Sequence, residues 1–305
     1  MIPRVVIAGT SSGAGKTSVT CGIIGALRRR GARVQGFKVG PDYIDPSYHA
    51  LASGRPGRNL DAFLSGPELI APLVRHGAAD ADVAVIEGVM GLFDGASGRG
   101  ELASTAHVAK LLRAPVVLVV DAAAMARSAA AIVHGYRTFD PDVDVAGVIF
   151  NKVGSDHHED LLREAVEPLG IPVLGAVRRD DRVEAPERHL GLVPAGEHEG
   201  RTREALAALA DAAERRVDLD GVLRLARAAP ALPDAPWSPA NGVRACIATF
   251  GSGNPFLLTV KPTHHNKAWL LFICFLLFDF FLPPSVTRRA ADGNPCLSRE
   301  RGLPR

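Results

Sequence analysis

The sequence has 305 residues, of which 47 % are apolar and 22 % charged, with a formal net charge of +2. These proportions suit a globular protein with a buried core, and so small a net charge argues against nucleic acid or an anionic membrane as a partner. Its cysteines, Cys21, Cys246, Cys274 and Cys296, lie too far apart for a metal or disulfide pattern. The first apolar run has the length of a strand, not of a signal peptide. We therefore expect a reducing, cytoplasmic setting.

Short runs rich in valine and isoleucine alternate with longer helical stretches along residues 1–228. The expected strands are Arg4–Ala8, Val34–Phe37, Val83–Ile86, Val116–Val120, Ala146–Phe150 and Val173–Ala176. The expected helices are Lys16–Arg30, Pro67–Arg75, Glu101–Arg113, Arg127–Phe139, His158–Leu169 and Arg201–Ala228. The strands show little polar alternation, which is typical of strands buried on both faces. This alternation predicts an α/β fold with a doubly wound, mainly parallel sheet.

The segment GTSSGAGKT, residues 9–17, follows the first expected strand and opens the first expected helix. In that context a glycine-rich loop surrounds phosphate oxygens with backbone N–H groups, as a P-loop does. We expect Lys16 to bridge the β- and γ-phosphates of ATP and the Thr17 hydroxyl to reach Mg²⁺. Further nucleotide-binding candidates are Gly13, Ala14, Gly15 and Ser18. The match to G-x-x-x-x-G-K-[ST] is incomplete, because Thr10 stands at the first glycine position and Gly9 precedes it.

A second polar cluster, FKVGPDYIDPSYH at residues 37–49, begins at the end of the second expected strand. Open parallel sheets bind ligands beyond the carboxyl ends of their strands, so Lys38, Asp42, Asp45 and His49 would lie on the functional edge. The alternative is an ordinary turn, since aspartate before proline is common turn chemistry. Two acids, a lysine and a tyrosine within the eight residues 38–45 favour the functional interpretation.

Three more acids come from the following segments. Glu87 ends a buried strand in VAVIEGVMGLFDG, where a charge requires a cation or hydrogen bonds. Asp94 lies in the glycine-flanked loop that follows. The alternative for Glu87 is a capping role, and the alternative for Asp94 is an ordinary loop aspartate with no function. Asp61 is either an acid at the metal site or a helix N-cap. The metal candidates are therefore Thr17, Asp61 and Glu87.

Two later strands also end in polar residues. Asp121 ends VVLVVDA, and Asn151 lies near the end of GVIFNKV. An asparagine there can read a purine edge with a paired donor and acceptor, although both residues could also merely end their strands. The pairs His157–His158 and His264–His265 lack a third ligand at metal spacing and fit solvated surface positions.

The C-terminal quarter differs in character from the rest. Residues 229–241 contain four prolines and predict an interdomain linker. Residues 243–251, VRACIATFG, resemble the first strand of another domain, but no alternating pattern follows. The apolar run 268–282 contains Asp279 and falls short of the about 20 residues of a spanning helix. Residues 242–305 therefore have three open interpretations: a frameshifted or truncated tail, a membrane anchor, or a buried helix.

Together these motifs resemble the cobyrinate and hydrogenobyrinate a,c-diamide synthases over roughly residues 1–240, most specifically in GPDYIDP and EGVMGLFDG. The resemblance implies ATP- and Mg²⁺-dependent amidation of the a and c carboxylates of a corrinoid substrate through acyl phosphates. It implies catalytic roles, in placing Mg²⁺ or steering substrate and ammonia, for Lys16, Asp42, Asp45, Glu87 and Asp94. Which of these acids places Mg²⁺ and which steers the substrate or ammonia remains open.

In that family ammonia comes from a C-terminal glutaminase domain with a nucleophilic cysteine, and residues 242–305 contain no such cysteine in a glycine-rich turn. This argues against glutamine-dependent synthesis by the chain alone. Several alternatives stay open: the chain uses free ammonia, works with a separate glutaminase, forms a homodimer, or is an inactive fragment. A partition-type regulatory ATPase is the competing class, although such proteins usually carry a lysine where Ser11 and Ser12 stand and lack GPDYIDP.

Overall fold

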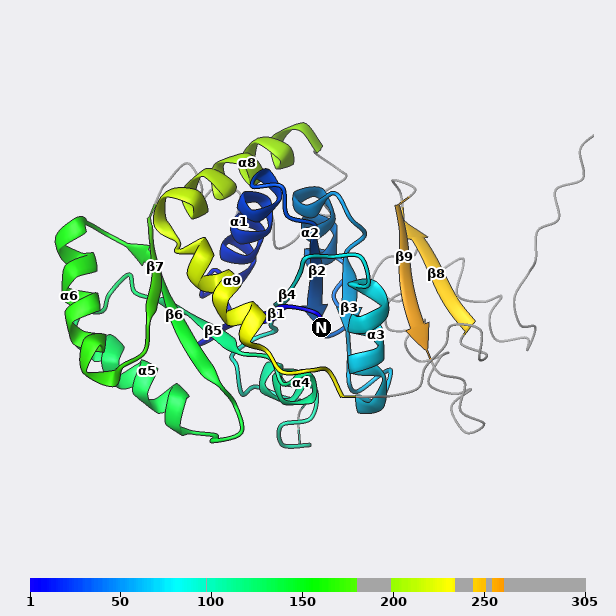
Figure 1. The fold of residues 1–305 in the computed structure, drawn as a ribbon, viewed down its shortest axis with the longest axis horizontal. Coiled ribbons are helices and arrows are strands. Elements are labelled where there is room, and N and C mark those ends of the chain that lie inside the picture. The colour runs from blue at the N-terminus through cyan, green and yellow to red at the C-terminus, as the bar shows by residue number, and fades with distance from the viewer. Residues whose placement is uncertain (97, 180–198, 234–243, 251–253, 261–305) are drawn as a thin grey trace, which may run out of the picture. The chain divides into compact units, whose positions relative to one another are not determined.

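The computed structural model describes residues 1–96, 98–179, 199–233, 244–250 and 254–260. Within these residues a seven-stranded sheet has the order β3-β2-β4-β1-β5-β6-β7, and each neighbouring pair is parallel. The strands are β1 (Arg4–Gly9), β2 (Val34–Val39), β3 (Arg58–Leu60), β4 (Val83–Glu87), β5 (Val116–Asp121), β6 (Val145–Val153) and β7 (Val173–Arg178). The predicted doubly wound parallel sheet is thereby confirmed (Figure 1).

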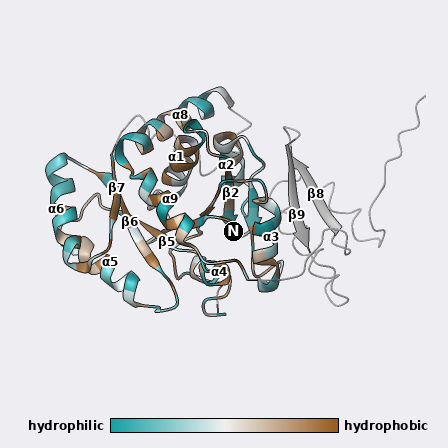
Figure 2. Cartoon of the chain, viewed as in Figure 1, coloured by the Kyte–Doolittle hydropathy of each residue, from teal (hydrophilic) through white to brown (hydrophobic). Residues whose placement is uncertain are grey.

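Helices cover both faces of this sheet. They are α1 (Lys16–Arg29), α2 (Asp45–Ser53), α3 (Ile70–Gly77), α4 (Thr105–Leu112), α5 (Ser128–Thr138), α6 (Asp156–Val166), α8 (Glu199–Arg216) and α9 (Leu219–Ala228). Alternate strand residues enter two separate cores: Val5 and Ile7 pack with α1, α2, α8 and α9, whereas Val6 and Ala8 pack with α3 to α6. The strands are accordingly apolar, and polar residues gather on the helices around them (Figure 2). Burial of both faces explains why the strands lack polar alternation.

Two elements at the edge of the sheet were not predicted. The strand β3 has only three residues, too few for a periodic pattern. The helix α2 begins at Asp45 and carries Pro46 in its first turn, where proline is well tolerated because no N–H partner is required. The segment predicted as a possible Asp-Pro turn is thus the start of a helix.

Two predicted helices were wrong in extent. The helix expected over residues 201–228 is two helices, because Asp218 caps a new one: its Oδ1 accepts from Gly221 N at 2.8 Å. The helix expected from Glu101 begins only at Thr105, because the Ser104 hydroxyl accepts from His107 N at 3.0 Å and caps it there. In both cases a capping side chain moved the boundary.

The first residues of the expected linker are bound to the sheet domain. The side chain of Arg4 is fully buried and donates from Nε to Leu112 O and from Nη2 to Pro230 O, each at 2.7 Å. Burial, with a smaller contribution from Arg113, lowers the pKa of Arg4 to about 10. Arg75 Nη2 donates to Pro233 O at 3.0 Å. Two arginines therefore hold the chain as far as residue 233.

After residue 243 the structure describes two strands. The strands β8 (Arg244–Phe250) and β9 (Asn254–Val260) pair in antiparallel register, so the strand predicted at 243–251 is confirmed. The interpretations offered for the run 268–282 concern residues outside the described part. Among the described residues, no helix has the length and apolar character that a membrane span requires.

A glycine brings α1 and α8 close together. A Cβ built on Gly22 would lie 2.8 Å from the backbone oxygen of Leu209 and 3.2 Å from the Cβ of Ala213. Since the nearest atom belongs to the backbone, a side chain at position 22 would push the helices apart. Gly135 in α5 is the opposite case, because its Cβ would meet nothing within 4 Å.

We expect Gly22→Ala to lower the free energy of unfolding by about 1–3 kcal/mol, because it overpacks the α1–α8 contact. Gly135→Ala, the matched helix substitution, should raise that free energy by up to about 1 kcal/mol, because alanine favours helix and meets no neighbour. Urea denaturation of the two variants and the parent protein measures both effects. Stabilisation by Gly22→Ala would contradict the close approach of the helices.

Candidate active site

Strand register brings the predicted polar residues to one edge of the sheet. Glu87, the last residue of β4, is paired with Lys38 of β2 on one side and with Ile7 of β1 on the other. The phosphate loop follows β1, and the GPDYIDP segment follows β2. Because β2, β4 and β1 are adjacent and parallel, the segments after them meet at their carboxyl ends.

The phosphate loop is shaped by glycines. Gly13 and Gly15 adopt φ values of +77° and +89°, in the left-handed region that glycine enters without strain. Lys16 folds back so that its Nζ donates to Ser11 O at 2.9 Å. A Cβ built on Gly9 would lie 2.9 Å from Cγ of Lys16. The glycine that precedes the usual motif position thus leaves room for the side chain of Lys16.

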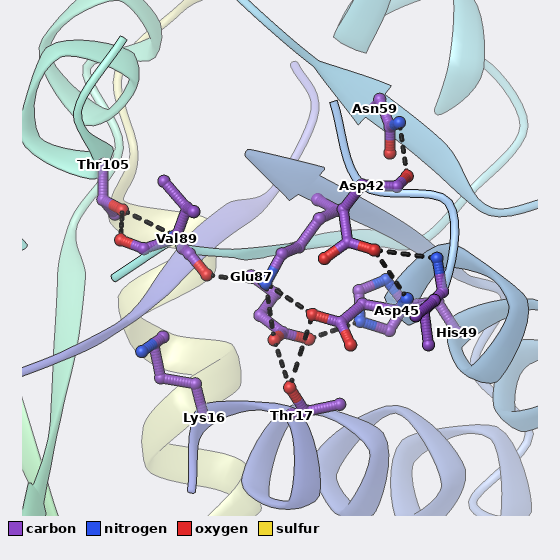
Figure 3. A network of polar contacts seen from close by, with 12 residues as sticks. Lys16, Thr17, Asp42, Asp45, His49, Asn59, Glu87, Val89 and Thr105 are labelled. Carbon is purple, nitrogen blue, oxygen red and sulfur yellow. Dashed lines mark hydrogen bonds and ion pairs between the residues drawn. The ribbon is translucent and has the colours of Figure 1, made fainter. Parts of the chain in front are cut away.

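A polar cluster surrounds the carboxylate of Glu87 (Figure 3). The Thr17 hydroxyl donates to Glu87 Oε1 at 2.6 Å, and Lys38 Nζ donates to the same oxygen at 2.9 Å. Lys38 Nζ also forms an ion pair with Asp45 Oδ2 at 2.6 Å. On the other side, His49 Nε2 lies 2.6 Å from Glu87 Oε2. Glu87 and His49 are fully buried.

The charges in this cluster are strongly coupled. Burial by itself would raise the pKa of Glu87, but Lys38, His49 and Thr17 together hold that pKa well below its usual range. Burial would likewise lower the pKa of Lys38, and the carboxylates of Glu87 and Asp45 reverse this and raise it. Burial and the charge of Glu87 raise the pKa of Asp45 to about 7. Asp45 is therefore a carboxyl group whose ionised form a further cation would stabilise.

The donor atoms at this point fit Mg²⁺. The Thr17 hydroxyl lies between the carboxylates of Glu87 and Asp45, with Asp45 Oδ2 at 3.5 Å from Thr17 Oγ1. Magnesium is usually held by one or two carboxylates together with substrate phosphates. The described residues contain no group of three His, Cys, Asp or Glu side chains suited to a metal. The protein donors are thus two carboxylates and a hydroxyl next to the phosphate loop.

The other three predicted acids cap loops in the structure. Asp42 Oδ1 accepts from the backbone of Ile44 at 2.8 Å and so shapes the start of α2. Asp61 Oδ1 accepts from Phe63 N at 2.8 Å and so closes the turn after β3, where no helix begins. Asp94 Oδ2 accepts from Gly91 N at 2.8 Å and closes the loop after β4. These bonds engage one carboxylate oxygen of each residue, and their roles in metal binding and catalysis remain predictions.

Asn151 contacts the phosphate loop directly. Its Nδ2 donates to Ala14 O at 3.1 Å, and Lys152 Nζ donates to Gly13 O at 3.2 Å. Both line a cavity of about 240 Å³ that also includes Ser18 and Arg178. The bond to Ala14 uses one of the two Nδ2 hydrogens, which leaves the other hydrogen and Oδ1 for a purine edge. Asn151 thus supports the phosphate loop, and its reading of a base remains a prediction.

The contact between His49 and Glu87 was not predicted, although His49 was placed on this edge. A signal for it exists in the sequence. Asp45 and His49 are four residues apart, and in a helix this spacing puts two side chains on one face. That signal depends on recognising α2, which the Asp-Pro turn interpretation concealed.

Comparison with known proteins identifies the class of this site. The family described as the CobQ/CobB/MinD/ParA nucleotide binding domain matches residues 5–193, and the chain belongs to this family. It therefore carries a nucleotide-binding domain. Among solved structures, chloroplast FtsY from Physcomitrella patens aligns with a TM-score of 0.45 and 17 % identity, covering 59 % of this chain and 60 % of that one.

Curated relatives define the resemblance more closely. A hydrogenobyrinate a,c-diamide synthase of Streptomyces coelicolor is 60 % identical over 236 residues, which are 77 % of this chain and 49 % of the relative. That of Thermobifida fusca is 54 % identical, over 80 % of this chain and 52 % of the relative. A cobyrinate a,c-diamide synthase of Syntrophotalea carbinolica is also 54 % identical, over 76 % and 50 %. The chain is thus similar to a,c-diamide synthases, as its motifs indicated, and spans about half their length.

We expect Lys38→Met to lower the free energy of unfolding by about 3 kcal/mol or more, because it leaves buried carboxylates without their cation. Lys110 is the matched control, since it also bridges two carboxylates, those of Glu101 and Asp140, but at the surface. Lys110→Met should cost less than about 1 kcal/mol. Urea denaturation of the nucleotide-free protein at neutral pH gives both values. Equal losses would contradict the burial of the Lys38 cluster.

We expect Asn151→Ala to weaken the binding of ATP and GTP to the same degree, roughly tenfold, because it removes a hydrogen bond that holds the phosphate loop. A changed ratio of ATP to GTP affinity would instead show that Asn151 reads the base. Asn59→Ala is the control, because Asn59 Nδ2 also donates to a backbone oxygen, Asp42 O at 2.6 Å, but away from the loop. Isothermal titration with each nucleotide measures the effect.

Proposed function

We propose that residues 1–228 form the ATP-dependent synthetase domain of an a,c-diamide synthase, which amidates two carboxylates of cobyrinic or hydrogenobyrinic acid. The observation that carries this proposal is the bond from Thr17, in the phosphate loop, to Glu87, within a cluster that Lys38 and Asp45 complete. The names of the relatives support the substrate class. Since the chain spans only part of their length, the whole reaction is part of the proposal.

The phosphate loop and Lys16 would hold the triphosphate of ATP. Thr17, Glu87 and Asp45 would hold Mg²⁺, which would offset negative charge on the transferring phosphoryl group. Lys38 keeps the two carboxylates together and so fixes the geometry of the donors. In such transfers the protein contributes mainly positioning and electrostatic stabilisation.

A carboxylate must be activated before ammonia can form the amide, because its own oxygen is a poor leaving group. An oxygen of the substrate carboxylate attacks the γ-phosphorus, the bond to the β,γ-bridging oxygen breaks, and ADP leaves. The resulting acyl phosphate is attacked at carbon by ammonia, which loses a proton as inorganic phosphate departs and the amide forms. Two such cycles yield the diamide. We propose that this site uses ammonia itself, and that any glutaminase only supplies it.

The test uses the purified full chain with MgATP, cobyrinic or hydrogenobyrinic acid, and either ammonium or glutamine, with products followed by mass spectrometry. We expect ammonium to support formation of the diamide. Thr17→Ala should lower the rate roughly 100-fold or more, and Thr17→Ser should restore much of it, because only the hydroxyl serves the reaction. A chain that binds ATP but forms no amide with ammonium would overturn the proposal.

A further inference from the structure

Two loops from strands on either side of β2 meet. Phe63 lies in the turn after β3, and Arg99 lies in the segment between β4 and α4. The guanidinium carbon of Arg99 is 5.2 Å from the centre of the Phe63 ring. In the sheet β3 and β4 are the two neighbours of β2, the strand that leads to Asp45 and the polar cluster.

Short-range bonds hold both residues in place. The backbone N–H of Phe63 donates to Asp61 Oδ1 at 2.8 Å, and the Ser65 hydroxyl donates to Asp61 O at 2.5 Å. Arg99 N donates to Ala96 O at 3.0 Å, and Ala96 N in turn donates to Leu102 O at 2.8 Å. Two separate turns, from the segments after β3 and β4, therefore place a guanidinium over an aromatic ring.

Exposed apolar side chains accompany this pair. Of six exposed large hydrophobic side chains among the described residues, three lie in the segments after β2, β3 and β4: Tyr43, Phe63 and Met90 are 39 %, 37 % and 42 % exposed. Met90 also has φ +47°, a left-handed conformation that is costly for a residue other than glycine. Such strain is concentrated at ligand-binding sites.

The position of the pair separates it from the nucleotide. The phosphate loop follows β1, and the cavity at Asn151 lies toward β6, whereas Phe63 follows β3 and Arg99 follows β4. In the order of the strands, Glu87 at the end of β4 separates Phe63 from the phosphate loop. A substrate held at the pair would face the triphosphate across the polar cluster.

A stacked guanidinium suits one ligand chemistry. A guanidinium whose positive charge lies over a ring face can still use its edge N–H groups to bind a carboxylate with two parallel hydrogen bonds. Apolar side chains nearby suit the face of a large ring. The combination fits an apolar macrocycle that carries carboxylates at its periphery.

We propose that Arg99, supported by Phe63, binds a peripheral carboxylate of the corrinoid substrate other than the one being amidated, while Tyr43 and Met90 contact the apolar face of its ring. The inference rests on the proposed function for the identity of the substrate. Arg99 thereby positions the substrate so that a second carboxylate reaches the polar cluster.

The test compares steady-state kinetics of variants with ammonium as the nitrogen source. Arg99→Gln should raise the KM for the corrinoid roughly tenfold and leave the KM for ATP unchanged, because it removes a charge-assisted hydrogen bond to one substrate only. The KM of Arg99→Lys for the corrinoid should lie between the values of the parent protein and Arg99→Gln, since lysine keeps the charge but neither the planar fork nor the stacking. Arg33→Gln is the control: Arg33 is an exposed arginine paired with Asp82, and it precedes β2 at the opposite edge of the sheet.

The ring has its own test. Phe63→Leu should raise the KM for the corrinoid about threefold, whereas Phe63→Tyr should keep it near the parent value because the ring face is retained. The effects of Arg99→Gln and Phe63→Leu should not add in the double variant, since the two side chains act as one unit. Additive effects, or an Arg99→Gln effect no larger than that of Arg33→Gln, would overturn the inference. A parallel rise in the KM for ATP would indicate a general structural defect and would also overturn it.

Direct binding separates this inference from the proposed function. Cobyrinic acid absorbs visible light, so its binding to the MgATP-loaded protein can be followed by spectroscopic titration without turnover. Binding that Arg99→Gln weakens, with no amide formed by the parent protein, would overturn the proposed function and support the inference. Absence of binding to the parent protein would overturn the inference.

Discussion

The buried carboxylate of Glu87 is the group on which the rest of the site depends. A charge that is fully removed from water is costly unless other groups compensate it, and here three side chains from different elements do so: Thr17 of α1, Lys38 of β2 and His49 of α2. Its two oxygens have different partners, since Oε1 accepts from Thr17 and Lys38 and Oε2 meets His49. The phosphate loop, β2 and α2 are thus held in register by one residue, and a shift in any of them would remove one of the partners of a buried charge.

The sheet order explains why a single residue can do this. β4 lies between β2 and β1, so its last residue is adjacent both to the strand that leads to the phosphate loop and to the strand that leads to Asp45. The nucleotide side, toward β1, β5 and β6, and the side of Phe63 and Arg99, toward β3, therefore meet at Glu87. Parallel strands make this arrangement general, because their carboxyl ends all lie at one edge.

The parts of this arrangement that local pattern determines were predictable. The phosphate loop was recognised because a strand precedes it and a helix follows, and Glu87 because a charge ends an otherwise apolar strand. The remainder depends on tertiary contacts. Nothing in the three residues of β3 marks a strand. Pro46 is equally compatible with a β-turn and with the start of α2, so the contact between His49 and Glu87 could not be predicted. Asp61 could be a helix N-cap or a metal ligand by sequence, and only the structure shows that its bond from Phe63 N closes a turn. The pairing of Phe63 with Arg99 joins residues of two loops and has no local signal.

The site is also a place where the protein holds residues in unfavourable states. Asp45 is buried next to a second carboxylate, which raises its pKa to about 7, and Met90 and Lys152 adopt positive φ angles of 47° and 59°. Lys152 is held there by its contacts with Gly13 O and Asp121. Such states persist only where the surrounding structure determines them, and here two buried cores fix the strands from both faces. A cation would relieve one of these states, because it would favour ionised Asp45. The stability of the sheet thereby keeps the edge prepared for binding, because little reorganisation remains to be done when the ligands arrive.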